Sequence, residues 1–501
     1  MYIYLHATVR SWELIHPVAH IRTRRREMTT TPFPHVAVFG LAVMGENLAR
    51  NIESRGYPVV VYNRTEQVTE SFLERFPEER FIGAFSIDEL IEKTASPRCI
   101  ILMIKAGQAV DRVLDDLLPR LTAGDIVIDG GNALYTDTER RVATCAEHGI
   151  EFLGVGISGG EEGALHGPSI MPGGSRRTWE HCSELFSKIS AKVGDEPCTD
   201  YVGPGGSGHF VKMVHNGIEY ADMQLIAEAY FLMREVLHLD NEAIAAHFAD
   251  WNKGRLNSYL MDITVEILKK KAEGSSEALV DLILDKAGQK GTGRWTVQAS
   301  LELGVPIPTI AAAVDARGLS ALKESRVEGA KIFKKPGQPV EASQLPVECV
   351  EQALFSGKVI AYAQGMALIQ ESSRAYDWNL ELDRIAKLWR GGCIIRAALL
   401  TEISAAYREA PDLTNLMFAQ GLQGQLEQSL TGLRSVVSSS ALFGIPVPGM
   451  SSALSYLESY TTARLPQNLI QAQRDYFGAH TYERIDREGV FHTEWMAGSE
   501  G

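Results

Sequence analysis

Several features are scarce in this sequence, and each absence excludes a class of protein. The six cysteines include no C-x-x-C pair, which argues against a zinc site or a disulfide framework and suits a reducing compartment such as the cytoplasm. Basic residues are outnumbered, 49 to 63, and the net charge of −14 argues against nucleic acid or an anionic membrane as the main partner. No apolar run reaches the ~18 residues of a membrane-spanning helix. An anionic substrate would therefore need a local basic pocket.

The first 34 residues differ in character from the rest of the chain. They contain the basic run Arg22-Thr23-Arg24-Arg25-Arg26 and only two acidic residues, Glu13 and Glu27, a composition that faintly resembles an organelle transit segment. Met28 lies a few residues before the first expected strand, so an upstream start or extension is the favoured interpretation. We predict that residues 1–34 are disordered and dispensable.

From His35 to about Ser158, short β-branched runs alternate with amphipathic helical patterns. This alternation predicts a Rossmann-like, doubly wound and mostly parallel sheet in an α/β domain. The expected strands are residues 35–40, 59–63, 98–104, 125–130 and 152–157.

After Gly208 the alternation stops, and long helical patterns dominate to about Ala463. They predict a large all-α domain that includes helices at residues 209–237, 242–250, 256–271 and 277–286. The expected division of a chain of 501 residues is an extension at 1–34, a Rossmann-like domain at 35–207, a helical domain at 208–463 and a C-terminal tail at 464–501.

The helical part contains an internal repeat. Leu303-Gly304-Val305-Pro306-Ile307-Pro308 returns 140 positions later as Phe443-Gly444-Ile445-Pro446-Val447-Pro448, and residues 218–229 resemble residues 360–371. Similar order and spacing predict a duplicated helical unit. In the pairing of 218–229 with 360–371, the counterparts of Lys212, Asn216 and Glu219 are Leu354, Lys358 and Ala361. Only the first copy keeps the chemical set, so we expect the second copy to be scaffold and interface.

A glycine-rich turn, Gly40-Leu41-Ala42-Val43-Met44-Gly45, lies between an expected strand and an expected helix. This is the G-x-G-x-x-G position with Ala at the middle glycine, where backbone N–H groups can approach a pyrophosphate. The end of the next strand carries Asn63-Arg64-Thr65 in place of the Asp or Glu that is usual for NAD. A cation there suits a 2′-phosphate and predicts NADP. Lys105 and Asn132 follow later strands and are further candidate cofactor contacts.

One helical stretch, Lys212-Met213-Val214-His215-Asn216-Gly217-Ile218-Glu219-Tyr220, combines an apolar setting with reactive side chains. At ~100° per residue, Lys212, Asn216 and Glu219 fall within ~60° of one helical face. An amine and a carboxylate on a half-buried face can exchange protons with a bound substrate. The alternative is a structural pair at the edge of the core.

Three further segments are rich in small or cationic residues. Ser158-Gly159-Gly160 follows the last expected strand, and glycines there allow backbone donors to reach an anion. Lys290-Gly291-Thr292 has the composition of a phosphate cradle. Arg317 interrupts an alanine-rich helix, and the segment after Pro466 carries Arg474 and His480.

Together, in this order, these motifs resemble the 6-phosphogluconate dehydrogenases from about His35 to Trp495. The resemblance implies NADP-dependent oxidative decarboxylation of 6-phosphogluconate without a metal, in a homodimer whose tails complete each other's sites. It implies that Ser158, Gly159, Gly160, His215 and Asn216 hold the sugar acid, with Asn132 nearby. It also implies that Tyr220, Lys290, Thr292 and Arg317, with Arg474 and His480 of the partner subunit, hold the phosphate.

The implied chemistry agrees with the helical face. Lys212 is expected to take the C3 hydroxyl proton, which requires a pKa below the ordinary ~10.4. Glu219 is expected to deliver a proton to C1 after CO2 leaves. Two alternatives stay open: a related β-hydroxyacid dehydrogenase of the 3-hydroxyisobutyrate type, and a catalytically silent NADP-binding scaffold. The duplication and the tail residues Arg474 and His480 argue against the first, and intact Lys212 and Glu219 argue against the second.

Overall fold

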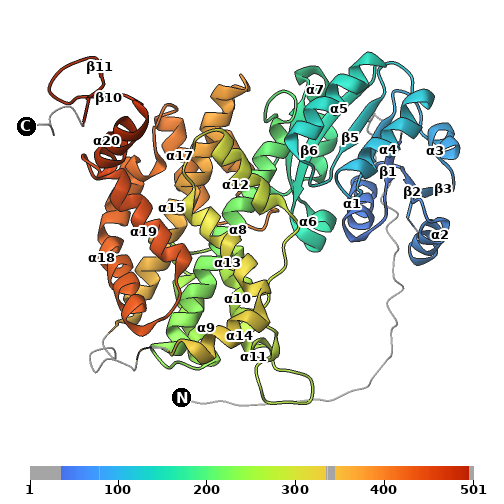
Figure 1. Ribbon diagram of the computed structural model, residues 1–501. Helices are drawn as coiled ribbons and strands as arrows, with labels where there is room; N and C mark the ends of the chain where they lie inside the picture. Colours follow the sequence, from blue (N-terminus) through green and yellow to red (C-terminus); the bar gives the residue numbers. More distant parts are fainter. Residues whose placement is uncertain (1–34, 78, 335, 337–344, 496–501) are drawn as a thin grey trace, which may run out of the picture. The chain divides into compact units, whose positions relative to one another are not determined.

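The computed structural model describes residues 35–77, 79–334, 336 and 345–495. The predicted extension at 1–34 lies outside these described residues. Figure 1 shows a sheet with its helices in the first part of the chain, followed by a helical part. None of the helices in the described ranges is both long and apolar enough to cross a membrane.

The first part is built on a seven-stranded sheet in the order β3-β2-β1-β4-β5-β6-β7. The first six strands are parallel, and β7 runs antiparallel to β6. This confirms the predicted doubly wound sheet, whose order changes direction between β1 and β4. The strands are β1 Val36–Phe39, β2 Val59–Tyr62, β3 Phe81–Ala84, β4 Cys99–Leu102, β5 Ile126–Asp129, β6 Glu151–Ser158 and β7 Ser169–Gly174.

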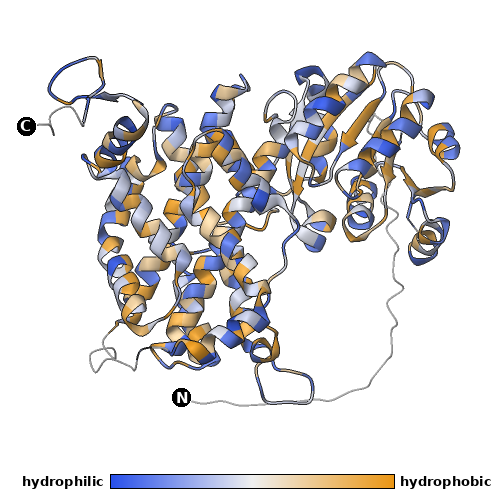
Figure 2. Ribbon diagram, viewed as in Figure 1, coloured by the Kyte–Doolittle hydropathy of each residue, from blue (hydrophilic) through white to orange (hydrophobic). Residues whose placement is uncertain are grey.

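Helices cover both faces of this sheet. As a result, alternate residues of the same strand pack into different hydrophobic cores. Val36 and Val38 pack with residues of α1 and α7, whereas Ala37 and Phe39 pack with residues of α3 and α4. The strands therefore read as continuous apolar runs, and Figure 2 colours most of them as hydrophobic. The connecting helices are α1 Val43–Ser54, α2 Glu66–Arg75, α3 Ile87–Lys93, α4 Gln108–Leu117, η1 Leu118–Arg120, α5 Tyr135–Glu147, α6 Gly160–His166 and α7 Arg176–Ile189.

Two strands of the sheet, β3 and β7, were not among those expected from the sequence. The edge strand β3 is only half-buried and contains Gly83, so it lacks the apolar run of a central strand. The sequence of β7, SIMPGG, is rich in Gly and Pro, which typically signals a loop. Pairing with the buried strand β6 holds β7 in extended conformation nevertheless.

The second part is dominated by two long helices, α8 and α15, of 29 residues each, which pack against each other. Their apolar residues share one core with those of the shorter helices around them. Before α8, the chain forms the short strands β8 Lys192–Val193 and β9 Glu196–Pro197. The second part consists of helices. These are α8 Ser207–Glu235, α9 Asn241–Trp251, α10 Tyr259–Lys269, α11 Leu279–Leu282, α12 Thr292–Glu302, α13 Pro308–Ala321, α14 Lys323–Ile332, α15 Val347–Ala375, α16 Leu382–Leu388, α17 Leu399–Glu409, η3 Leu416–Phe418, α18 Gln420–Phe443 and α19 Pro448–Tyr460.

The predicted duplication appears as matched helices. The starts of α8 and α15 differ by 140 positions, as do the starts of α13 and α19. The residues before α13 and α19 have nearly the same backbone angles, φ −128° and ψ 53° at Ile307 against φ −132° and ψ 59° at Val447. The helix starts align the two copies in a register that differs by two residues from the pairing of residues 218–229 with residues 360–371. The counterparts of Lys212, Asn216 and Glu219 then become Gln352, Ser356 and Val359, and the second copy still lacks the chemical set.

The helix expected at 277–286 is wrong for most of its length. Only Leu279–Leu282 is helical, and Ile283 is extended. Asp285 pairs with Lys323 and Arg326 of α14, which fixes this segment as a connection across the surface. The helix expected at 256–271 begins at Tyr259, because the Ser258 hydroxyl accepts a hydrogen bond from the Met261 N–H and caps it.

The tail forms a helix, α20 Gln467–Gly478, and a small hairpin of β10 Tyr482–Glu483 and β11 Val490–Phe491. Asp475 joins them: it is fully buried and accepts hydrogen bonds from the Thr481 and Thr493 N–H groups, the His492 ring and the Trp495 indole. Arg474 lies on α20 as expected, but His480 lies beyond its end, because Ala479 is left-handed at φ 48° and ends the helix.

Candidate active site

The site is built where α8 crosses the sheet at very short range. A Cβ on Gly156 of β6 would lie 2.3 Å from the Lys212 Cβ, and one on Gly208 of α8 would lie 2.4 Å from the Met171 carbonyl oxygen of β7. Only glycine permits such close packing. Lys212 is therefore held beside the carboxyl end of β6, with 5% of its surface exposed.

Polar side chains of α8 and β6 form a buried hydrogen-bonded group around this lysine. Lys212 Nζ donates to Asn216 Oδ1 over 2.7 Å and lies 3.3 Å from His215 Nδ1. His215 Nδ1 lies 3.0 Å from Asn216 Oδ1, and its Nε2 lies 3.3 Å from Ser158 Oγ. An imidazole that donates from Nδ1 to Asn216 and accepts from the Ser158 hydroxyl satisfies both ring nitrogens. The structure thus brings four predicted site residues together.

The ionisation of this group is set by burial. Burial lowers the pKa of Lys212 to about 8, although the neighbouring Glu219 and Cys393 favour its charged form. Burial and the Lys212 amine hold the pKa of His215 well below its usual range, so the imidazole is neutral. Burial also raises the pKa of Glu219, against the opposing effect of Lys212 and Arg317. An amine and a carboxyl with pKa values moved toward each other suit proton transfer at neutral pH.

The glycines after Ser158 shape the loop that follows β6. Gly159 has φ 143°, and a Cβ there would lie 2.6 Å from the Gly392 carbonyl oxygen. Gly160 begins α6 and also has positive φ, 62°. Side chains other than glycine would strain this turn, so both positions after Ser158 require glycine.

Helix α12 lines the next side of the site and packs against α8 through glycines. A Cβ on Gly217 would contact Thr296, and one on Gly293 would contact the Tyr220 ring at 2.6 Å. This packing places Thr292, at the start of α12, where its hydroxyl accepts a hydrogen bond from Asn216 Nδ2 at 3.2 Å.

Arg317 of α13 completes the described side of the site. Its guanidinium lies 3.4 Å from the centroid of the Tyr220 ring, and it donates to the Gly288 carbonyl oxygen over 3.3 Å. Lys290 is exposed on the loop before Gly291, which is left-handed at φ 102°. A cation on an aromatic face and a second cation on the adjacent loop form an anion-attracting end of the site.

The two tail residues are not brought to this group within the described part of the chain. Arg474 is exposed and donates to Gln471, and His480 is exposed and packs on the Phe477 ring. No hydrogen bond or ion pair links either side chain to Lys212 or its described neighbours.

The glycine-rich turn after β1 has the geometry that a pyrophosphate needs. Gly40 has φ 103°, and a Cβ there would lie 2.6 Å from the Met103 carbonyl oxygen. A Cβ on Gly45 would collide with the Gly40 carbonyl oxygen at 1.8 Å. Helix α1 begins at Val43, and no side chain caps the N–H groups of its first turn. The turn therefore offers backbone donors at a helix N-terminus, and the residues fit a dinucleotide.

The side chains around this turn fit the same group. Asn63 Oδ1 accepts a hydrogen bond from the Leu41 N–H over 3.2 Å, and so ties the end of β2 to the turn. Arg64 and Thr65 are exposed beside it, before α2. Lys105 and Asn132 are exposed after β4 and β5, at the same carboxyl edge of the sheet.

Two buried charged residues close to the site were not among the predicted site residues. Asp222 of α8 and Lys358 of α15 form an ion pair of 2.5 Å. The loop carrying Gly392 and Cys393, which faces Gly159, was also missed. The only sequence signal for the ion pair was a polar residue, Lys358, at an otherwise apolar stretch of the second copy.

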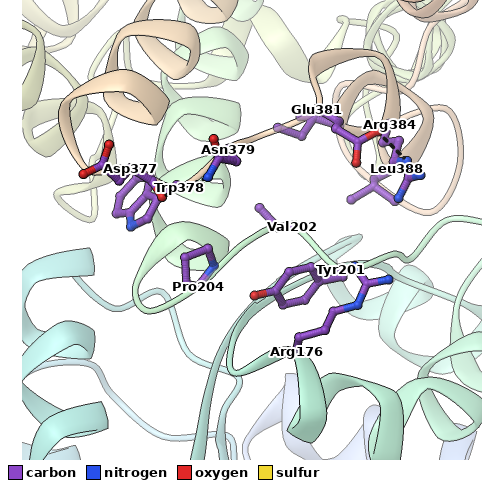
Figure 3. A pocket seen from close by; sticks show the side chains of 11 residues that line it. Arg176, Tyr201, Val202, Pro204, Asp377, Trp378, Asn379, Glu381, Arg384 and Leu388 are labelled. Carbon is purple, nitrogen blue, oxygen red and sulfur yellow. Dashed lines mark hydrogen bonds and ion pairs between the residues drawn. The ribbon is translucent and has the colours of Figure 1, made fainter.

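A separate cavity of about 280 Å³ lies between α7, the segment around Tyr201 and residues 377–388 (Figure 3). Its cations are engaged: Arg176 with Glu180 and the Tyr201 ring, and Arg384 with Glu381 and Asp200. The described residues that line it include no member of the Lys212 group, so the cavity is distinct from that group.

Two family models match the chain: the NAD binding domain of 6-phosphogluconate dehydrogenase over residues 35–203 and the 6-phosphogluconate dehydrogenase C-terminal domain over residues 208–495. The chain is 54% identical over 463 residues to an NADP(+)-dependent, decarboxylating 6-phosphogluconate dehydrogenase of Bacillus subtilis, which covers 92% of this chain and 99% of that protein. An NAD(+)-dependent, decarboxylating relative of the same organism is 50% identical, with the same coverage.

A solved structure of Plasmodium falciparum 6-phosphogluconate dehydrogenase, described in apo form and in complexes with NADP+ and with 6-phosphogluconate, has a TM-score of 0.89 to this chain. It is 45% identical and covers 92% of this chain and 100% of its own. The similarity extends through the sheet, the helical part and the tail. The chain belongs to the 6-phosphogluconate dehydrogenase family.

Proposed function

We propose that the chain catalyses the oxidative decarboxylation of 6-phospho-D-gluconate to D-ribulose 5-phosphate and CO2, with reduction of NADP, as a step of the pentose phosphate pathway. The observation that carries this proposal is the buried Lys212, with its pKa lowered to about 8, on one helical face with Glu219. The shared family of the relatives, all decarboxylating dehydrogenases by name, supports the same reaction.

Lys212 is the base that takes the proton of the C3 hydroxyl. Its amine must be neutral to do so, and burial makes the neutral form accessible near pH 8. Asn216 accepts one N–H of the amine and orients it. NADP, when bound, accepts the hydride from C3. Once protonated, Lys212 stabilises the oxyanion that develops at C3 as the 3-keto acid loses CO2.

Glu219 delivers a proton to C1 of the resulting enediol. The carboxyl must be protonated at that step, and burial favours its protonated form. It lies seven residues after Lys212 on α8, so both groups can reach adjacent carbons of one bound sugar acid. Lys212 and Glu219 thus divide the base and acid roles.

The remaining site residues hold the two ends of the substrate. The carboxylate and hydroxyls contact Ser158, Gly159, Gly160, His215 and Asn216, with Asn132 nearby, while Tyr220, Lys290, Thr292 and Arg317 hold the phosphate. The neutral, buried His215 supports this assignment, because it supplies a fixed dipole without competing for the proton of Lys212. Arg317 and Lys290 supply the positive charge that the acidic chain otherwise lacks.

NADP is held by the turn formed by Gly40, Leu41, Ala42, Val43, Met44 and Gly45, where the uncapped first turn of α1 offers backbone donors to the pyrophosphate. Arg64 pairs with the 2′-phosphate, beside Asn63 and Thr65, and Lys105 and Asn132 contact the nicotinamide half. The exposed guanidinium of Arg64 at the end of β2 supports NADP over NAD.

The chain works as a homodimer in which residues 464–501 of each subunit reach the other's site, where Arg474 and His480 bind the phosphate. In this arrangement the chain consists of a Rossmann-like domain at residues 35–207, a helical domain at 208–463 and the tail at 464–501. Exposed apolar residues on the tail support it: Leu469, Ile470, Tyr476 and Phe477 lie along α20, and Phe477 is 71% exposed. Such a patch on a short helix needs a partner surface.

The experiment is an assay of NADPH formation with 6-phosphogluconate, with CO2 measured in parallel. The proposal expects one CO2 for each NADPH. Turnover of 3-hydroxyisobutyrate without CO2 would instead identify the related β-hydroxyacid dehydrogenase, and no turnover of either substrate would identify a silent scaffold. A reducing compartment such as the cytoplasm is expected from six cysteines that are all unpaired.

A further inference from the structure

The buried ion pair of Asp222 and Lys358 has no role in the function proposed above. Lys358 Nζ donates to Asp222 Oδ1 over 2.5 Å and to Ser258 Oγ over 3.4 Å. Only 3% of the lysine side chain and 2% of the aspartate side chain are exposed. Burying two charges costs free energy that their attraction seldom exceeds, so stability alone is a poor explanation for the pair.

Among the described residues, only one of the two carboxylate oxygens of Asp222 accepts a hydrogen bond. Its second carboxylate oxygen, Oδ2, is buried, and no donor among the described residues reaches it. A native protein rarely leaves such an atom unpaired without a functional reason. In a poorly solvated surrounding, the charge on this carboxylate acts on its neighbours more strongly than it would in water.

Glu219 is one of the groups on which this charge acts. Asp222 follows it by three residues on α8, which puts the two Cβ atoms ~5–6 Å apart. The other charged or titratable groups that face Glu219 are Lys212 and His215 of α8 and Arg317 of α13. After burial, Lys212 and Arg317 lower the pKa of Glu219, and Asp222 raises it. Asp222 therefore opposes part of the effect of the two cations.

We propose that Asp222, held in place by Lys358, is a positioning residue that keeps one proton on Glu219 and thereby leaves Lys212 free to act as the base. This inference rests on the roles of Lys212 and Glu219 in the proposed function. The productive enzyme has a neutral Lys212 and a protonated Glu219. It competes with the form that has the same number of protons but carries the proton on Lys212.

The competition gives a distinctive pH dependence of kcat. At low pH both groups are protonated, and the productive form arises by loss of the Lys212 proton alone. A change that affects only Glu219 leaves the rate unchanged in this range. On the plateau, where Lys212 and Glu219 share one proton, a weaker hold of Glu219 on that proton lowers the productive fraction in proportion.

The test is the pH profile of kcat for a double variant, Asp222→Leu with Lys358→Met, which replaces the pair by apolar side chains of similar size and should keep the fold. We expect the plateau to fall several-fold and the acid limb to move to lower pH by the corresponding amount, while the rates below that limb match those of the parent. The single variant Asp222→Glu keeps the negative charge beside Lys358, so it should retain most of the parental plateau rate.

A control is Asp125→Asn, which removes another buried carboxylate, the partner of Arg98 at the opposite edge of the sheet. It should lower the melting temperature without moving the profile. A double variant with the parental profile, or with the same loss at every pH, would overturn the inference. If that double variant does not fold, Asp222→Asn with Lys358→Met, which also removes both charges, gives the same readout. Parental turnover of Glu219→Gln would instead contradict the proposed function itself.

Discussion

Glu228 of α8 accepts a hydrogen bond from the Gly449 N–H at the start of α19 over 2.7 Å, and one from the Met450 N–H over 2.8 Å. In the other half of the duplication, Gln364 of α15 accepts one from the Thr309 N–H at the matching position of α13, over 2.9 Å. Each long helix thus caps a short helix next to it. The two halves differ in charge, because only one of the caps is a carboxyl.

This difference predicts a pH-dependent stability. Burial raises the pKa of Glu228 from 4.5 to about 7, despite its three hydrogen-bond donors. A group whose pKa is raised by folding stabilises the fold fully below the ordinary value, and that contribution disappears as the pH rises through about 7. From pH 5 to pH 8, the parent should therefore lose about 2.5 kcal/mol of unfolding free energy relative to Glu228→Gln.

Urea unfolding of both proteins across this pH range measures the effect. Gln364→Glu is the matched variant in the other half, since it introduces a carboxyl at a neutral cap. It should acquire a pH dependence of the same sign. A constant difference between the parent and Glu228→Gln at every pH would show that Glu228 is ionised throughout.

Cofactor preference should depend on Arg64. Arg64→Ala removes one charge-assisted contact with the 2′-phosphate, so NADP binding should weaken by about 1.5–3 kcal/mol while NAD binding changes little. Titration of both cofactors checks this. Arg80→Ala, at the start of β3 and paired with Glu53, is the control and should leave both affinities unchanged. An unaltered ratio of the two affinities in Arg64→Ala would remove Arg64 from the 2′-phosphate site.

Mixed dimers test the exchange of tails. Lys212→Met and Arg474→Ala should each be inactive alone at limiting substrate. A dimer that combines them has one site with an intact Lys212 and a tail with an intact Arg474. If both chains are unfolded and refolded together, about a quarter of the parental activity should return.

The activity of the mixture is compared with that of each variant refolded alone, and mass measurement confirms that the hybrid dimer has formed. Arg487→Ala, which changes a hairpin arginine that lies over the Phe491 ring, is the control for Arg474→Ala and should be active when it is refolded alone. Hybrids that form but stay inactive would mean that each tail serves its own subunit or only the structure.

The sheet could be predicted well from the sequence, because its strands are buried on both sides and their apolar runs are continuous. Strand β7 could not, because its Gly-Pro sequence has no strand pattern and depends on pairing with β6. The helix expected at 277–286 failed for a similar reason: Asp285 pairs with Lys323 and Arg326 of a later helix, a contact that local periodicity does not encode.

The same distinction applies to the site. Lys212, Asn216 and Glu219 could be placed on one face because helical spacing determines it, and the turn at Gly40 because its glycines follow a strand. The pair of Asp222 and Lys358 joins residues 136 positions apart. Only the packing of α8 on α15 brings them together, so the sequence offered no direct sign of it.

The proposed reaction depends on Lys212 as the base. Lys212→Met keeps the length and the apolar stem of the side chain but removes the amine, so turnover should fall by at least about a hundredfold. The melting temperature and the NADP affinity should stay near those of the parent, as they should in Lys192→Met, which changes an exposed lysine of β8. The decisive measurement is the kcat of Lys212→Met with saturating NADP and 6-phosphogluconate. Loss of turnover with cofactor binding intact is the predicted result, and near-parental turnover would contradict the account.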